Sequence, residues 1–130
     1  MISVHYLTAE HLSEIAEAAV EGTVLLRDPG LLASAAERPR TVLFGEEQYP
    51  TLLDKAAALM HSIARFHPLI DGNKRLAWLA TYTFCELNGA PVVATNRQAV
   101  DVTLAVAAGE LNEVADIAKA LARLVTVPGE

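Results

Sequence analysis

The chain has 130 residues, of which 52% are hydrophobic and only 5% aromatic. This length suits one domain spanning residues 1–130, and an apolar composition rich in alanine but poor in aromatics favours packed helices over sheets. The formal net charge of −6 does not fit the basic face of a nucleic-acid binder, so we expect no direct nucleic-acid binding. The N-terminus lacks the features of a signal peptide and no apolar run could span a bilayer. We therefore expect a cytoplasmic protein without membrane attachment.

Three helices are expected in the first half of the chain. Thr8 can cap a helix from Ala9 to Val20, whose apolar residues form one stripe. Asp28 followed by proline predicts a short helix from Pro29 to Glu37. Tyr49-Pro50 then begins a helix of about 15 residues with one apolar face, which leads the chain to Arg65, Phe66 and His67.

The stretch from Thr41 to Gln48 is the least helical part of this half. Its apolar run Val42-Leu43-Phe44 is followed by Gly45, a pattern that predicts a short extended flap or hairpin. A plain surface loop is the alternative interpretation.

Three further helices are expected in the second half. Asn73 to Leu87 is apolar on nearly every side, which is typical of a central, buried helix. Asn96 is expected to cap a helix that ends near Ala108, and Asn112 to cap a last helix from Glu113 to Val125. The pattern predicts an all-α fold, a compact bundle of about six helices in which a motif loop leads into the buried central helix.

The motif is His-Pro-Leu-Ile-Asp-Gly-Asn-Lys-Arg at residues 67–75. It lies where a loop enters a helix N-terminus, and unpaired backbone N–H groups together with the helix dipole favour an anion there. Gly72 allows the backbone to approach a ligand closely. Lys74 and Arg75 add positive charge, and an arginine can grip phosphate oxygens with two donors.

Two further side chains of the motif suggest what is done to the phosphate. Asp71 is a hard oxygen ligand that could hold Mg²⁺. His67 supplies an imidazole, which can accept a proton near neutral pH. Such a set suits phosphoryl or nucleotidyl transfer, in which positioning and charge neutralisation dominate. An ordinary turn at residues 71–73 followed by solvated charges is the alternative.

These residues resemble the signature of the Fic/Doc superfamily, His-x-Phe-x-Asp/Glu-Gly/Ala-Asn-Gly/Lys-Arg. The expected order of helices also resembles that family over nearly the whole chain. The small size and the lysine of Asn-Lys-Arg place the chain nearer the Doc type than the AMP-transferring Fic enzymes. The matching residues are His67, Asp71, Gly72, Asn73, Lys74 and Arg75.

The resemblance implies a toxin of a toxin–antitoxin pair that transfers the γ-phosphate of ATP to a Ser/Thr hydroxyl of a protein, arresting translation. His67 would be the catalytic base and Asp71 the Mg²⁺ ligand. The residues implied to hold phosphates are Gly72, Asn73, Lys74, Arg75 and Arg65.

The resemblance also implies two protein partners. One is the target, by resemblance elongation factor Tu, which would pair as an added strand with the flap. The other is a Phd-like antitoxin whose C-terminal helix lies in a groove of the toxin. The implied flap residues are Thr41, Val42, Leu43 and Phe44.

Three positions depart from the family pattern. Leu69 replaces the motif phenylalanine, Trp78 stands where typical Fic enzymes have a second arginine, and Leu79 replaces an asparagine of Doc. AMP transfer and a catalytically silent binding module therefore stay open as alternatives. Outside the motif, we expect Trp78 and Cys85 in the core, and His61 as a surface or satisfied core histidine.

Overall fold

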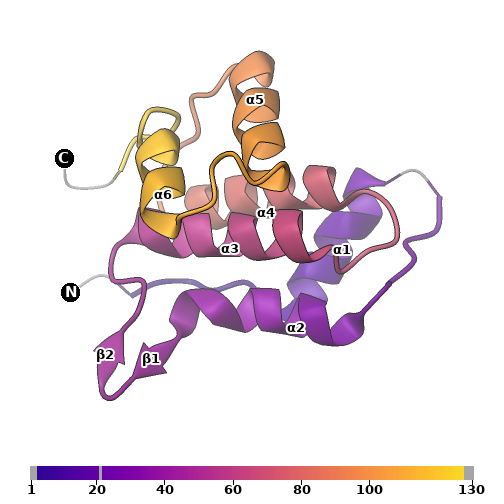
Figure 1. The fold of residues 1–130 in the computed structure, drawn as a ribbon, viewed down its shortest axis with the longest axis horizontal. Helices are drawn as coiled ribbons and strands as arrows, with labels where there is room; N and C mark the ends of the chain where they lie inside the picture. Colours follow the sequence, from indigo (N-terminus) through magenta and orange to yellow (C-terminus); the bar gives the residue numbers. More distant parts are fainter. Residues whose placement is uncertain (1–2, 21, 128–130) are drawn as a thin grey trace.

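A computed structural model describes residues 3–20 and 22–127 of the chain (Figure 1). Six α-helices and a two-stranded hairpin form there, which confirms the expected all-helical fold of about six helices with a short flap hairpin. Within those residues no helix is both long and apolar enough to cross a membrane. The elements are α1 (Ala9–Ala19), α2 (Pro29–Glu37), the 3₁₀ turn η1 (Arg38–Arg40), β1 (Val42–Leu43), β2 (Glu46–Glu47), α3 (Leu52–Phe66), α4 (Asn73–Leu87), α5 (Asn96–Ala107) and α6 (Val114–Ala122).

Helices α3 and α4 share the centre of the bundle. Each is 15 residues long, and nine residues of α3 and seven of α4 are buried, so α4 is not the only central helix. Helix α2 packs along one side of α3, α5 and α6 pack on the other, and α1 packs against α4 (Figure 1). The motif loop connects the two central helices at one end of the bundle.

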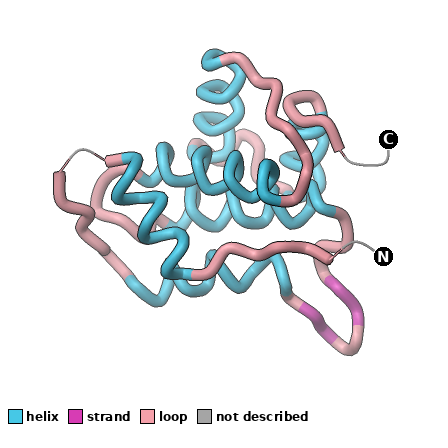
Figure 2. The backbone as a smooth tube through the Cα atoms, turned by 180° about the vertical axis from the view of Figure 1, so that it is seen from behind, coloured by secondary structure: helices cyan, strands magenta, loops and turns pink. Residues whose placement is uncertain are grey.

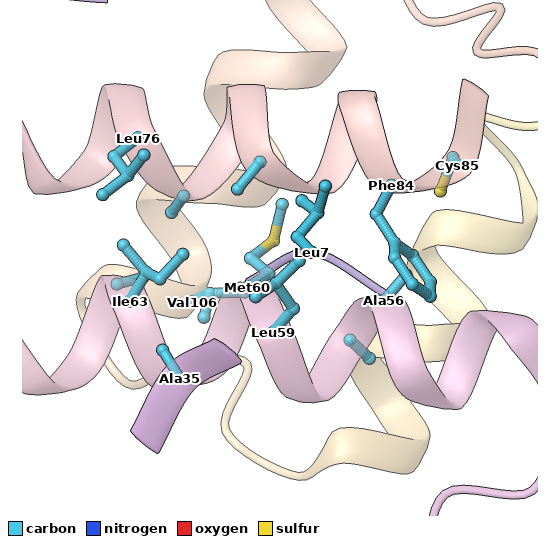
Figure 3. Close-up of a cluster of buried hydrophobic side chains, with 14 of the residues drawn as sticks. Leu7, Ala35, Ala56, Leu59, Met60, Ile63, Leu76, Phe84, Cys85 and Val106 are labelled. Carbon is cyan, nitrogen blue, oxygen red and sulfur yellow. The ribbon is translucent and has the colours of Figure 1, made fainter. Parts of the chain in front are cut away.

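The core lies between these two helices and is filled by aliphatic side chains and one aromatic ring (Figure 3). Alanines at four positions of α3 are fully buried and let neighbouring helices approach closely. Cys85 lies in this core, as expected. Burial, together with the nearby Glu86, raises the pKa of its thiol to about 12. Large residues of the cluster include Leu7, Leu59, Met60, Ile63, Leu76, Phe84 and Val106.

Two helices begin one or two residues away from the predicted positions because threonine supplies the cap. The Thr51 hydroxyl accepts from the N–H of Asp54 at 3.0 Å, so α3 begins after Thr51 and not at Tyr49-Pro50. Thr95 caps α5 in the same way, so Asn96 is the first helical residue and not the cap. In both cases the third helical residue bonds back to the threonine N–H, which completes a capping box.

The last helix is shorter than predicted. Asn112 does not cap it, because its side-chain oxygen lies 3.0 Å from Nε2 of His61. The helix ends at Ala122 because the chain then turns, and Val125 forms a backbone bridge with Val92. The tertiary contact of Asn112 therefore replaces the local one that the sequence suggested.

The hairpin formed by β1 and β2 projects from the helical body (Figure 2). Its two-residue turn is Phe44-Gly45, and both residues have positive φ, 52° and 79°. This is the twist that tight hairpins prefer, although phenylalanine rarely adopts it. The Phe44 side chain is fully exposed at the tip. The predicted hairpin at residues 41–48 is therefore confirmed.

A buried lysine ties the hairpin to the bundle. Lys55 of α3 is only 2% exposed, and its ammonium donates to Glu47 of β2 at 2.9 Å and to the carbonyl of Tyr49. It also lies 5.8 Å from the centre of the Tyr6 ring. Since a buried charge needs such partners, Lys55 fixes the base of the hairpin on α3.

Candidate active site

The motif loop turns sharply at His67, directly after the last residue of α3. His67 has φ 56° and ψ 64°, the left-handed conformation that residues with a side chain rarely adopt. Its N–H still donates to the carbonyl of Ile63 at 3.3 Å, while its side chain is exposed. The turn therefore presents the imidazole to solvent at the start of the loop.

A segment from the first half of the chain, residues 25–28, holds the motif loop from outside. Its backbone pairs with that of residues 68–70 in a short antiparallel contact. This contact fixes the loop although the two segments are about 40 residues apart in sequence. The bonds are Arg27 N and Asp28 N to Pro68 O at 2.8 and 3.1 Å, and Ile70 N to Leu25 O at 3.0 Å.

The side chain of Arg27 supports the backbone of His67. Its Nε donates to the His67 carbonyl at 2.6 Å, and its Nη2 donates to the Phe66 carbonyl at 2.5 Å. The last carbonyls of a helix lack partners within it and carry partial negative charge, so a guanidinium is well placed there. Sequence reasoning missed Arg27, since no local pattern links it to the motif.

Asn73 closes the motif loop from inside. Its side-chain oxygen accepts from the N–H of Leu69 at 2.9 Å, and its side-chain nitrogen donates to the carbonyl of Leu69 at 2.8 Å. Asn73 is only 7% exposed, so what it can offer a phosphate is its backbone N–H. Leu69 itself is 1% exposed and fills the core position expected of the motif phenylalanine.

Gly72 precedes α4 and has a conformation that suits glycine alone. Its φ is 90°, and a Cβ added to it would lie 2.7 Å from Cγ2 of Val20. The Gly72 carbonyl accepts the first bond of α4, from Leu76 N at 2.9 Å. The N–H groups of residues 73–75 have no partner inside the helix and form its electropositive end.

Asp71 lies beside this helix end with an exposed carboxylate. Its Oδ1 accepts from the N–H of Gly72 at 2.9 Å, and Oδ2 has no hydrogen bond to the described residues. This arrangement fits a hard cation that takes its other ligands from phosphate and water. The described part of the chain contains no cluster of three metal-binding side chains, so a cation here would depend on the substrate's oxygens.

Both arginines predicted to hold phosphates bind the C-terminal end of a helix. Nη1 of Arg75 donates to the carbonyl of Ala19, the last residue of α1, at 3.0 Å. Nη1 of Arg65 donates to the carbonyl of Ala107, the last residue of α5, also at 3.0 Å. Each guanidinium has five N–H donors, so most donors remain for a ligand.

A cleft of about 470 Å³ runs from the N-terminus of α4 to α5. It brings Asp71, Gly72, Lys74 and Arg75 together at one end, whereas His67 and Arg65 lie outside its lining. Trp78 was expected in the core, but it is half-buried and forms part of the cleft wall. The other lining residues are Val20, Leu79, Ala99, Val100, Thr103 and Leu104.

A polar network joins η1, α3 and the loop before α6. Arg38 donates to Tyr49, to Ser62 and, at 2.7 Å, to Nδ1 of His61. Since arginine can only donate, Nδ1 accepts and Nε2 donates to Asn112. Burial lowers the pKa of His61, and the positive charge of Arg38 lowers it further, while the bond to Asn112 opposes this shift. His61 is thus a satisfied, half-buried histidine, as expected.

A second hollow of about 460 Å³ lies between α2 and α3. It extends from Leu31 and Phe66, next to His67, to Thr41 at the base of the hairpin. Its wall is mainly apolar, with Arg38 on one side. A segment bound here would lie between the hairpin and the motif.

Two comparisons with known proteins bear on this site. The model of the Fic/DOC family matches residues 6–85, which include the hairpin, α3 and the whole motif. The chain is also 46% identical over 89 residues to a protein named Toxin Doc from Mycolicibacterium smegmatis (strain ATCC 700084 / mc(2)155). That alignment covers 68% of each chain.

Proposed function

Because this chain belongs to the Fic/DOC family, we propose that it is the toxin of a toxin–antitoxin pair and transfers the γ-phosphate of ATP to a serine or threonine hydroxyl of a protein. The observation that carries this proposal is the polar end of the α4 cleft. There the free N–H groups at the start of α4 lie with Lys74 and Arg75 around Gly72. Such an end is suited to bind phosphate oxygens.

In the proposed reaction His67 accepts the proton of the target hydroxyl. The hydroxyl oxygen forms a bond to the γ-phosphorus as the bond between that phosphorus and the β–γ bridging oxygen breaks, so ADP leaves. Asp71 would hold Mg²⁺, which neutralises phosphate charge when bound. Arg27 would keep His67 in its strained backbone conformation through the two carbonyls it binds.

Two side chains favour transfer of the γ-phosphate over transfer of AMP. Lys74 occupies a position where AMP-transferring members of the family carry glycine, so less room is left for a phosphate beside the backbone. Trp78 stands where those members carry a second arginine, and its indole cannot pair with phosphate charge. AMP transfer is therefore the second outcome that the experiment must separate.

We assign target docking to the hairpin. Strand β1 pairs only with β2 among the described residues, so its outer edge, from Thr41 to Phe44, can accept an added strand. Val42 and Leu43 are about half exposed, which fits a surface that a partner covers. By family resemblance the target would be elongation factor Tu.

We assign the Phd-like antitoxin to the hollow between α2 and α3. That hollow is mainly apolar and lies between the hairpin and Phe66. The apolar face of an antitoxin helix would fit there and would cover the approach of a target to His67. Toxin, antitoxin and target would meet in the cytoplasm.

The test is to incubate the full chain with ATP, Mg²⁺ and bacterial elongation factor Tu, and to measure the intact mass of the factor. An added mass of about 80 Da with wild type, absent with His67→Ala, would support phosphate transfer, whereas about 329 Da would indicate AMP transfer. An unchanged mass would count against this target. ATP binding by calorimetry would then separate an enzyme with another target from a silent binding module.

A further inference from the structure

The apolar half of the α4 cleft has no role in the chemistry proposed above. Beyond the phosphate-binding end, its walls are Trp78 and Leu79 of α4 and four residues of α5, Ala99, Val100, Thr103 and Leu104. Val100 is 54% exposed and Leu104 is 47% exposed, although both are large aliphatic residues. They lie one helical turn apart and therefore share a face of α5.

This wall is continuous with the phosphate-binding end. Trp78 follows Lys74 by four residues and Arg75 by three, so all three lie on one face of α4. A ligand whose phosphates bind at the start of α4 would extend along this face, towards Trp78 and α5. The whole cleft, at about 470 Å³, has the size of a site for a small organic ligand.

We infer that the purine base of the nucleotide stacks on Trp78 and is enclosed by Val100 and Leu104 of α5. This inference rests on the proposed function, which requires ATP phosphates at the start of α4. Trp78 is suited to the task because it is half-buried and braced edge-on by Tyr82, with ring centres 6.4 Å apart. An aromatic side chain in the wall of a cleft can stack on a base without reading its identity.

Polar groups contribute little to this end of the cleft. The hydroxyl of Thr103 donates to the carbonyl of Ala99 at 2.8 Å within α5. The other side chains there are aliphatic except for the indole of Trp78, so the base is held by apolar contact and stacking. The site therefore contacts the flat face of the purine and makes few hydrogen bonds to its edge.

The chain carries its own reporter for this inference, since Trp78 is its single tryptophan. The full-length protein is titrated with Mg–ATP, with adenosine and with inorganic triphosphate, while tryptophan emission is recorded. ATP and adenosine are expected to change the emission, because both carry the base. Triphosphate is expected to compete with ATP without changing the emission.

A variant of α5 tests the same wall without touching the motif. Leu104→Glu is expected to weaken ATP binding at least about fivefold by calorimetry, with triphosphate binding unchanged. Leu87→Glu is the matched control, because Leu87 is similarly exposed (49%) but lies on the last turn of α4, outside the cleft. Circular dichroism should show that both variants keep their helices.

The possible results separate this inference from the proposed function. ATP binding that leaves the emission unchanged and is insensitive to Leu104→Glu would overturn the base site and leave the proposed function standing. A protein that binds neither ATP nor triphosphate would overturn both. Trp78→Ala is expected to weaken the binding of ATP and adenosine but not of triphosphate, a difference that a merely structural effect of the indole would not produce, and Trp78→Phe is expected to retain most of the ATP binding.

Discussion

The side chain of Asn73 makes two hydrogen bonds to the backbone of one residue, Leu69, and thereby closes the motif loop. Asn73→Ala leaves the buried N–H and carbonyl of Leu69 without partners. We expect a loss of about 2 kcal/mol or more in the free energy of unfolding, measured by urea denaturation. Asn73→Asp should also lose stability, because its carboxylate cannot donate and would place an oxygen against the Leu69 carbonyl in a buried site. Asn96→Ala is the control, since Asn96 is exposed at the start of α5; equal losses at 73 and 96 would contradict this role.

Gly72 should tolerate alanine worse than another glycine of the same backbone conformation. Gly72→Ala adds a Cβ 2.7 Å from Val20, whereas Gly45→Ala, at a similar positive φ, meets nothing within 4 Å. Gly45→Ala should therefore cost about 1–2 kcal/mol of stability from backbone strain alone, and Gly72→Ala should cost more. Adding Val20→Ala to Gly72→Ala should recover the excess, as a double-mutant cycle by urea unfolding can measure. Strict additivity of the two changes would show that the close approach is relieved elsewhere.

Arg27→Met should slow the reaction without weakening nucleotide binding. Methionine keeps part of the apolar stem but loses both bonds to the carbonyls of Phe66 and His67, so His67 would leave its position. We expect kcat for phosphate transfer to fall about tenfold or more, because small displacements of a reacting group are costly. KM for ATP should change little, since Arg27 does not line the α4 cleft. Arg97→Met, at an exposed position of α5, is the control. A rise in KM with kcat intact would refute a positioning role.

The network around His61 predicts a pH dependence of stability. Burial lowers the pKa of His61 in the folded protein, and Arg38 and Arg65 lower it further, while Asn112 and Glu113 oppose the shift. A histidine whose folded pKa lies below its unfolded value binds protons preferentially when unfolded. The contribution of His61 is then fully present above about pH 6.5 and is lost as the pH falls through the folded pKa.

Urea unfolding at pH 7.5 and pH 5.5 measures this effect. Wild type and His5→Gln should lose stability between the two values, and His61→Gln should lose less. His5→Gln is the matched control because its histidine is exposed and lies outside the network. The same pH dependence in all three proteins would exclude His61 as its source.

The apolar character of the base site predicts weak discrimination between purine nucleotides. The hydroxyl of Thr103 donates its hydrogen bond to the carbonyl of Ala99, so the side chain has no donor left for the edge of the base. ATP and GTP should therefore bind within about tenfold of each other, as competition titrations followed by Trp78 emission can measure. A preference for ATP much larger than this would require a polar contact to the adenine edge.

Local patterns in the sequence predicted the helices well. The start of α2 at Pro29 and both ends of α4 agree with prediction. These signals depend only on neighbouring residues: an aspartate cap followed by proline begins α2, and Asn88-Gly89 ends α4. The starts of α3 and α5 were displaced towards threonine caps. Each of these threonines is followed three residues later by a side chain that completes a capping box, a sequence pattern that marks the true start of the helix.

The contacts that shape the site could not be predicted in the same way. Arg27 reaches His67 across 40 residues, and Arg38 reaches His61 across 23. The sequence predicts that Asn73 binds phosphate, yet its side chain forms hydrogen bonds to the backbone of Leu69 within the motif loop. No periodicity encodes such pairings, because they depend on how separate helices pack.

The two walls of the α4 cleft belong to different parts of the chain, and this has a consequence for how such proteins diversify. The family model matches residues 6–85, which supply Trp78 and the end of the cleft proposed to bind phosphate, while α5 begins only at residue 96. Substitutions in α5 would thus change the part of the ligand that contacts this helix, while the residues of the motif stay the same. Ligand preference would then change in evolution without an intermediate that has lost the motif.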